Sequence, residues 1–92
     1  MITTDKVSCL AIIELLAAHG VKDIVLSPGS RNTPLIIAAR RYGHGVRTHV
    51  VIDERTAAFF GLGIALQTRC PVALICTSGT AVLNYGPAIA EA

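Results

Sequence analysis

Three short apolar runs in this chain each end at a polar turn that is followed by a helical pattern. The runs cover residues 24–26, 50–52 and 72–76, and the turns begin at Ser27 and Thr77 and, for the middle run, at residue 53. Near-continuous apolar strands that alternate with helices favour an α/β fold, in which a parallel sheet carries helices on both faces. The carboxyl ends of parallel strands meet at one edge of the sheet, where open α/β sheets bind ligands. The pattern therefore predicts one site assembled from three turns.

Helix and strand signals alternate along the whole chain, in the order α-β-α-β-α-β-α. We expect a first helix from near Thr4 to just before Gly20, because glycine suits the left-handed stop of a helix. A second helix has Asn32 or Thr33 as its cap and Pro34 in its first turn, where proline is tolerated. The other expected elements are strands over 47–52 and from 71, a helix over 55–68, and a single last helix capped by Ser78 or Thr80.

Composition argues against several classes of function. The formal charge is +2, and no basic run is present, which argues against a nucleic-acid surface. The longest uncharged apolar stretch, residues 57–66, is too short to span a bilayer, and the first residues do not form a secretory signal. Cys9, Cys70 and Cys76 are odd in number and lack metal-ligand spacing. We expect reduced thiols in a cytoplasmic protein, and no metal ligands in this chain.

The helices are more apolar than a small lone domain requires. Residues 10–18 contain a single charge, Glu14, and residues 57–66 have no polar face. Helices that are apolar all round are buried on more than one side, which 92 residues cannot provide. Residues 88–92 also read as the middle of a helix. We therefore expect the first part of a larger, oligomeric protein, and we expect this piece alone to be inactive and poorly soluble.

Two other groups of residues are expected to be structural. His19, His44 and His49 share no metal-ligand spacing, so surface or packed positions are expected for them. Gly61 and Gly63 lie inside the third predicted helix, where each glycine costs about 1 kcal/mol relative to alanine. The close approach of another helix is the expected reason for both glycines.

Glu54 is the strongest candidate for chemistry. It follows an apolar strand and precedes an apolar helix, which would enclose its carboxyl group. Burial penalises the charged form and would raise the pKa of this carboxyl, so that it could exchange a proton with a ligand nitrogen near neutral pH. On position alone an equal alternative exists, in which Asp53 and Glu54 are acids that favour the helix N-terminus and Asp53 is the cap.

The other two turns carry groups that could bind a ligand. Arg31 is poorly placed for the helix dipole, so bidentate recognition of a substrate carboxylate would give it a purpose. A local ion pair or a solvated side chain is the alternative. Thr77, Ser78 and Gly79 offer backbone N–H groups and hydroxyls at a helix start, which suit a polar or anionic group. Helix capping accounts for that turn equally well, and no glycine-rich phosphate-binding motif is present.

Taken together, the three turns resemble one enzyme family. The segments S-P-G-S-R-N-T-P-L (27–35), D-E-R-T-A-A-F-F-G-L-G (53–63) and T-S-G-T-A-V-x-N-Y-x-P-A (77–88) are similar to the N-terminal domain of the 2-succinyl-5-enolpyruvyl-6-hydroxy-3-cyclohexene-1-carboxylate synthases. These are thiamine diphosphate enzymes of menaquinone biosynthesis. The resemblance covers nearly the whole chain, with the motifs in the same order. It implies that residues 1–92 are the N-terminal part of a thiamine diphosphate pyrimidine-binding domain, and that later domains are absent from the chain.

The resemblance also implies roles for individual residues. Glu54 matches the glutamate that hydrogen-bonds N1′ of the cofactor's aminopyrimidine and so activates the cofactor. Ser30 and Arg31 match positions on the isochorismate side, with Arg31 facing a carboxylate. The residues expected to line the pyrimidine pocket are Pro28, Thr77, Ser78 and Gly79.

The implied reaction decarboxylates 2-oxoglutarate and adds the succinyl carbanion equivalent to isochorismate. It uses thiamine diphosphate and Mg²⁺, whose Gly-Asp-Gly and Asn ligand motif has no counterpart in this chain. At least a homodimer is implied, because the site forms between domains of two subunits. One alternative is an acetolactate-synthase-like thiamine enzyme, against which the pair Ser30 and Arg31 argues. Others are a non-enzymatic α/β small-molecule-binding module, in which Glu54 is only a helix-end acid, and a dimerisation domain.

Overall fold

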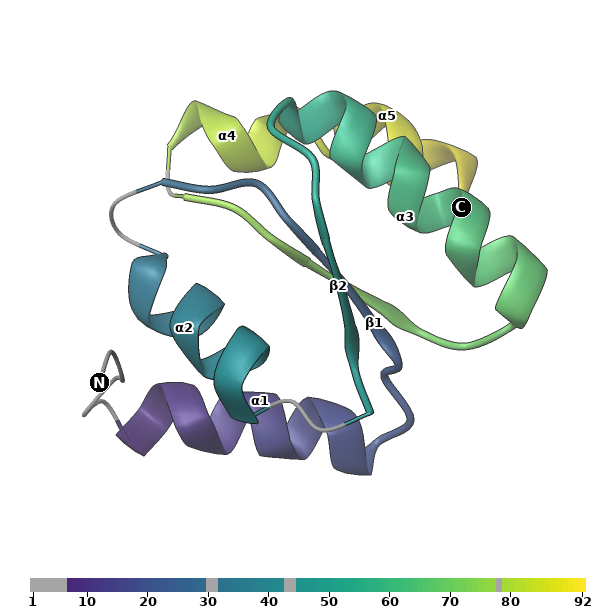
Figure 1. Ribbon diagram of the computed structural model, residues 1–92. Coiled ribbons are helices and arrows are strands. Elements are labelled where there is room, and N and C mark those ends of the chain that lie inside the picture. The colour runs from purple at the N-terminus through teal and green to yellow at the C-terminus, as the bar shows by residue number, and fades with distance from the viewer. Residues whose placement is uncertain (1–6, 30–31, 43–44, 78) are drawn as a thin grey trace.

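A computed structural model describes residues 7–29, 32–42, 45–77 and 79–92 of the chain. Figure 1 shows a small parallel sheet with α1 and α2 on one face and α3 to α5 on the other, as the apolar strand pattern predicts. The elements are α1 (Val7–Ala18), β1 (Asp23–Leu26), α2 (Thr33–Tyr42), β2 (Arg47–Val50), α3 (Glu54–Thr68), β3 (Val72–Ile75), α4 (Thr80–Leu83) and α5 (Gly86–Glu91).

The sheet has the strand order β2-β1-β3, and both pairings are parallel. In register, Leu26 at the end of β1 lies opposite Val50 of β2 and Ile75 of β3. The three strands therefore end together, and the turns that follow them lie at one edge of the sheet. This confirms the predicted fold class and the predicted meeting of the three turns.

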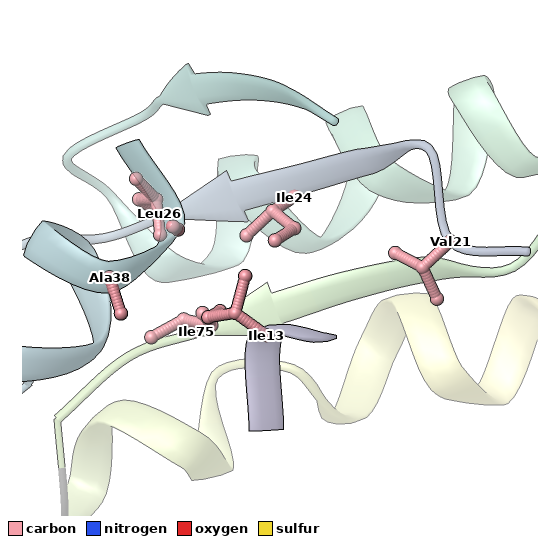
Figure 2. Packing of buried hydrophobic residues seen from close by; sticks show 7 residues of the cluster. Ile13, Val21, Ile24, Leu26, Ala38 and Ile75 are labelled. Atoms are coloured by element: carbon pink, nitrogen blue, oxygen red, sulfur yellow. The ribbon is translucent and has the colours of Figure 1, made fainter. Parts of the chain in front are cut away.

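The central strand β1 separates two apolar cores. Ile24 and Leu26 are fully buried on the face covered by α1 and α2, where Ile13 of α1 packs against them (Figure 2). Val25 is buried on the opposite face, under α3. Residues of the larger core are Ile13, Val21, Ile24, Leu26, Ala38, Ala39 and Ile75.

Several helix boundaries follow from local chemistry as predicted. Gly20, just beyond α1, has a φ of 89°, in the left-handed region that glycine adopts without strain. Asp53 is the cap of α3, because its Oδ2 accepts hydrogen bonds of 2.8 Å from both the backbone N–H and the hydroxyl of Thr56. The predicted third helix begins one residue early, at Glu54, and ends at Thr68.

The last helix was predicted as one element, and the structure divides it into α4 and α5. Pro87 explains the break, since it has no N–H to donate to the Leu83 carbonyl one turn earlier. The predicted side-chain cap is also wrong for Thr80, because Gly79 occupies the cap position and no side-chain hydrogen bond is made there. Strand β2 stops at Val50 and not at the predicted residue 52. Its partner β1 ends at Leu26, which lies opposite Val50, and the chain then turns at Pro28.

The prediction for Gly61 and Gly63 is wrong in detail. A Cβ atom at Gly61 would lie 2.7 Å from Leu74 Cδ2 and 3.4 Å from Val72 Cγ1, so the sheet approaches this glycine and not another helix. At Gly63 nothing lies within 4 Å of the corresponding position.

In the described part of the chain, no helix has both the length and the apolar character that a bilayer span requires. Cys9, Cys70 and Cys76 are free thiols.

Candidate functional site

Ser27 joins the ends of all three strands. Its backbone N–H donates to the Ile75 carbonyl of β3 over 2.8 Å, and its hydroxyl donates to the Val51 carbonyl after β2, also over 2.8 Å. Ser27 is 1% exposed, so these bonds are made away from water. Its hydroxyl is therefore used by the fold and is not available to a ligand. The sequence placed Ser27 in a candidate turn but gave no signal of this structural role.

Asn32 closes the first turn. Its side-chain amide donates to the Ser27 carbonyl over 3.0 Å, and its Oδ1 accepts from the Gly29 N–H over 2.9 Å. The Thr33 hydroxyl adds a bond of 3.1 Å to the Gly29 carbonyl. The Asn32 carbonyl accepts from Ile36, so Asn32 holds the cap position of α2 as predicted, while its side chain faces back into the turn. These bonds tie Asn32 and Thr33 to Ser27 and Gly29, on either side of residues 30–31.

Gly29 brings the first turn against the third. A Cβ atom at Gly29 would collide with the Cγ2 methyl group of Thr77, so the backbone of one turn touches the side chain of the other. Thr77 is half-buried, and its carbonyl accepts a bond of 3.2 Å from the Cys76 thiol. The contact shows that the first and third turns touch at Gly29 and Thr77.

Glu54 is the first residue of α3 and follows Val51, Ile52 and Asp53 after the end of β2. The preceding Asp53 carboxylate is committed to Thr56, whose hydrogen bonds hold the pKa of Asp53 below its usual value. Glu54 is half-buried. The two neighbouring acids therefore differ in position, since Asp53 is exposed and caps the helix, whereas Glu54 is the half-buried first residue of α3.

Two other predicted site residues, Pro28 and Gly79, lie at the same edge. Pro28 is exposed beside Ser27, and Gly79 is exposed with a φ of 76°, which only glycine adopts readily. Ser30, Arg31 and Ser78 lie outside the described residues.

Tyr85 is a buried polar residue at this end of the molecule that sequence reasoning missed. It lies between α4 and α5, is 6% exposed, and packs with Ala58 of α3 and with Cys76 after β3. Burial, the adjacent Cys76 thiol and the charge of Glu54 raise the pKa of Tyr85 well above its ordinary value. The one available signal was a tyrosine next to Gly86 in a helix pattern, which does not distinguish a buried hydroxyl from an exposed one.

A second polar cluster occupies the opposite edge of the sheet. The buried Asp23 carboxylate accepts two hydrogen bonds of 2.9 Å from the Arg47 guanidinium, and His49 Nε2 lies 2.9 Å from Asp23 Oδ1. Hydrogen bonds from Arg47 and His49 hold the pKa of Asp23 below its usual value despite burial. The cluster joins Asp23 and Arg47, the first residues of β1 and β2, to His49, the third residue of β2. His49 is thus a partly buried structural residue, as expected.

Within the described ranges, no three side chains of histidine, cysteine, aspartate or glutamate lie close enough together to hold a metal ion.

Comparison with known proteins agrees with the geometry of the edge. Residues 10–92 match the family model described as "Thiamine pyrophosphate enzyme, N-terminal TPP binding domain". Among curated proteins, the 2-succinyl-5-enolpyruvyl-6-hydroxy-3-cyclohexene-1-carboxylate synthase of Dechloromonas aromatica is 56% identical over 82 residues, which are 89% of this chain and 15% of that protein.

Two further synthases of the same name show similar values. The protein of Geobacillus kaustophilus is 54% identical over 87 residues, covering 95% of this chain and 15% of that protein. The protein of Cytophaga hutchinsonii is 58% identical over 81 residues, covering 88% of this chain and 14% of that protein. The chain therefore spans about 15% of the length of the curated relatives it matches, and by its family match it belongs to the N-terminal thiamine-pyrophosphate-binding domains of the thiamine pyrophosphate enzymes.

Proposed function

We propose that this chain supplies the aminopyrimidine-binding edge of a thiamine diphosphate-dependent synthase. The synthase would decarboxylate 2-oxoglutarate and add the succinyl carbanion equivalent to isochorismate, in menaquinone biosynthesis. The observation that carries the proposal is the position of Glu54, a half-buried glutamate beside the edge where three parallel strands end. The names of the similar curated proteins support the choice of reaction.

The residues present fit an aminopyrimidine ring. A flat, polar heterocycle needs a carboxyl group for a ring nitrogen and close-packed walls on its sides. Glu54 offers the carboxyl, and the Gly29–Thr77 contact offers a wall in which no side chain projects from residue 29. In the same strand-end region, Ser27 and Asn32 hold the wall rigid through their buried hydrogen bonds.

The chemistry divides between the cofactor and the chain. Thiamine diphosphate, when bound, supplies the carbon nucleophile and the electron sink for decarboxylation. Glu54 would hold a proton at the ring nitrogen. The bound ring would exclude water from that hydrogen bond and so strengthen it. Pro28, Thr77, Ser78 and Gly79 would shape the pocket around the ring.

The same proposal includes the binding of isochorismate and magnesium, the oligomeric state and the location of the protein. Ser30 and Arg31 would bind isochorismate, with the Arg31 guanidinium on a carboxylate. Magnesium would be bound by residues outside this chain. The working protein would be a cytoplasmic homodimer or larger oligomer. The exposed aromatic rings of Phe59 and Phe60 on α3 support an additional covering surface.

The test replaces Glu54 by glutamine in the full-length synthase and measures turnover of 2-oxoglutarate with isochorismate. Loss of the proton-sharing carboxyl should lower turnover by at least about 100-fold. Asp53→Asn is the matched control, because asparagine caps a helix as well as aspartate and the adjacent acid carries no assigned chemistry. Equal activity of the Glu54→Gln variant and the native enzyme would refute the proposal. Pyruvate in place of isochorismate tests the acetolactate-type alternative, which requires pyruvate to be the better acceptor.

A further inference from the structure

The Tyr85 hydroxyl meets the geometric criteria for a hydrogen bond with no described residue, although the Cys76 thiol beside it is close enough to raise its pKa. Tyr85 is 6% exposed, so water does not replace the missing partner. Buried hydroxyl groups in native proteins are nearly always paired, and an unpaired one destabilises the fold. The hydroxyl therefore requires a partner that is brought to it.

Tyr85 packs against α3 one helical turn after Glu54. Its ring packs with Ala58, which lies four residues after Glu54 and therefore on the same face of α3, one turn further from the strand ends. The helices α3 and α5 lie side by side, with the start of α5 directly after Tyr85 (Figure 1). The charge of Glu54 acts on the Tyr85 hydroxyl and contributes to its raised pKa.

Two titratable groups act on this hydroxyl from the elements around it, Glu54 of α3 and Cys76 after β3. The Cys76 thiol already donates to the Thr77 carbonyl, and sulfur is a weak acceptor. A carboxylate is a much stronger acceptor for an O–H donor. Because its pKa is raised, Tyr85 keeps its proton throughout the working pH range and remains a donor.

We propose that Tyr85 is a positioning residue for Glu54, whose carboxyl accepts the buried Tyr85 hydroxyl when the cofactor ring occupies the site. One carboxyl oxygen faces the tyrosine and the other faces the ring nitrogen. The hydroxyl thereby fixes the orientation of the carboxyl and favours its ionised form, which leaves the shared proton on the ring. This inference rests on the proposed function, because it gives Tyr85 a role only if Glu54 meets the ring.

The experiment compares Tyr85→Phe with the native full-length synthase by titration calorimetry with thiamine diphosphate and Mg²⁺ between pH 5.5 and 8.5, a window of about three pH units around the working pH. Removing a hydrogen bond to a charged group should weaken cofactor affinity by about tenfold. The acid limb of the affinity profile should move to higher pH by about one unit. Thermal unfolding of the cofactor-free variant should be unchanged or higher, because phenylalanine fills the same space without an unpaired hydroxyl.

Controls separate this role from packing and from the proposed function. Cys76→Ala should keep the native affinity profile, and a profile like that of Tyr85→Phe would assign the hydroxyl to the thiol and overturn the inference. In the Glu54→Gln background, Tyr85→Phe should have little further effect, because the two residues act together. If Glu54→Gln is impaired and Tyr85→Phe matches the native protein at every pH, the positioning role fails while the proposed function stands. If Glu54→Gln is unimpaired, the proposed function itself fails.

Discussion

The Ser27 hydroxyl donates a hydrogen bond of 2.8 Å to the Val51 carbonyl and so joins the turn after β1 to the end of β2. The Ser27 N–H simultaneously holds the end of β3 through Ile75. The positions of Glu54 and Thr77 depend on these two bonds, because each residue follows within three positions of a carbonyl that Ser27 binds. One small buried side chain thus sets the spacing of the strand ends.

Ser27→Ala in the full-length protein should lower the free energy of unfolding by about 1–3 kcal/mol, because the Val51 carbonyl would be left unpaired. Chemical denaturation measures the change. Thr33→Val is the control, since the Thr33 hydroxyl makes an exposed bond to the Gly29 carbonyl whose loss should cost less than about 0.5 kcal/mol. Equal losses for the two variants would contradict the role assigned to Ser27.

Gly61→Ala should be less stable than Gly63→Ala by about 1–2 kcal/mol, although both substitutions improve helix propensity. The new methyl group at residue 61 would press on Leu74 and Val72, whereas at residue 63 it meets nothing within 4 Å. Gly63→Ala should raise the free energy of unfolding by up to about 1 kcal/mol. Melting temperatures of the two variants, compared with the native protein, decide the order. A higher melting temperature for Gly61→Ala than for Gly63→Ala would contradict the prediction. It would mean that Leu74 and Val72 move aside for the new methyl group more easily than their distances indicate.

Asp23 should make stability depend on pH in the acid range. Its pKa is lower in the folded protein than in the unfolded chain, so the folded state binds fewer protons there. The contribution is complete above the unfolded value of about 3.9 and is lost as the pH falls through the lower folded value. Unfolding midpoints measured from pH 7 to pH 2 should therefore fall below about pH 4. In Asp23→Asn this part of the fall should disappear, and stability at neutral pH should be lower because Arg47 loses its carboxylate. An unchanged acid profile in that variant would count against the assignment.

Apolar runs and capping residues were sufficient to predict most of the architecture. The parallel sheet and its common edge follow from strand composition, and the Asp53 cap follows from its place before an apolar helix. The break before α5 was missed, because Pro87 was not interpreted as the first turn of a new helix. Local pattern does not show whether the chain before a proline stays helical.

Some residues of the candidate site could be identified from the sequence, and others could be identified only from the structure. Glu54 could be named from the sequence because its place after an apolar strand and before an apolar helix is a local property. The structural use of Ser27 and the burial of Tyr85 could not, because both depend on which segments distant in the chain meet them. Asp23 was missed for the same reason, since its partners Arg47 and His49 lie more than twenty residues away.

The contact between Gly29 and Thr77 implies a paired constraint on sequence variation. A bulkier residue at position 29 could be accommodated only if position 77 lost its methyl group, and the reverse substitution alone would open a gap in the wall. Substitutions at positions 29 and 77 should therefore be correlated among relatives. A single substitution should be disfavoured, and a compensating pair of substitutions should be tolerated. Residues 29 and 77 together would then set the width of the proposed aminopyrimidine pocket, and a change at one position alone could not adjust it.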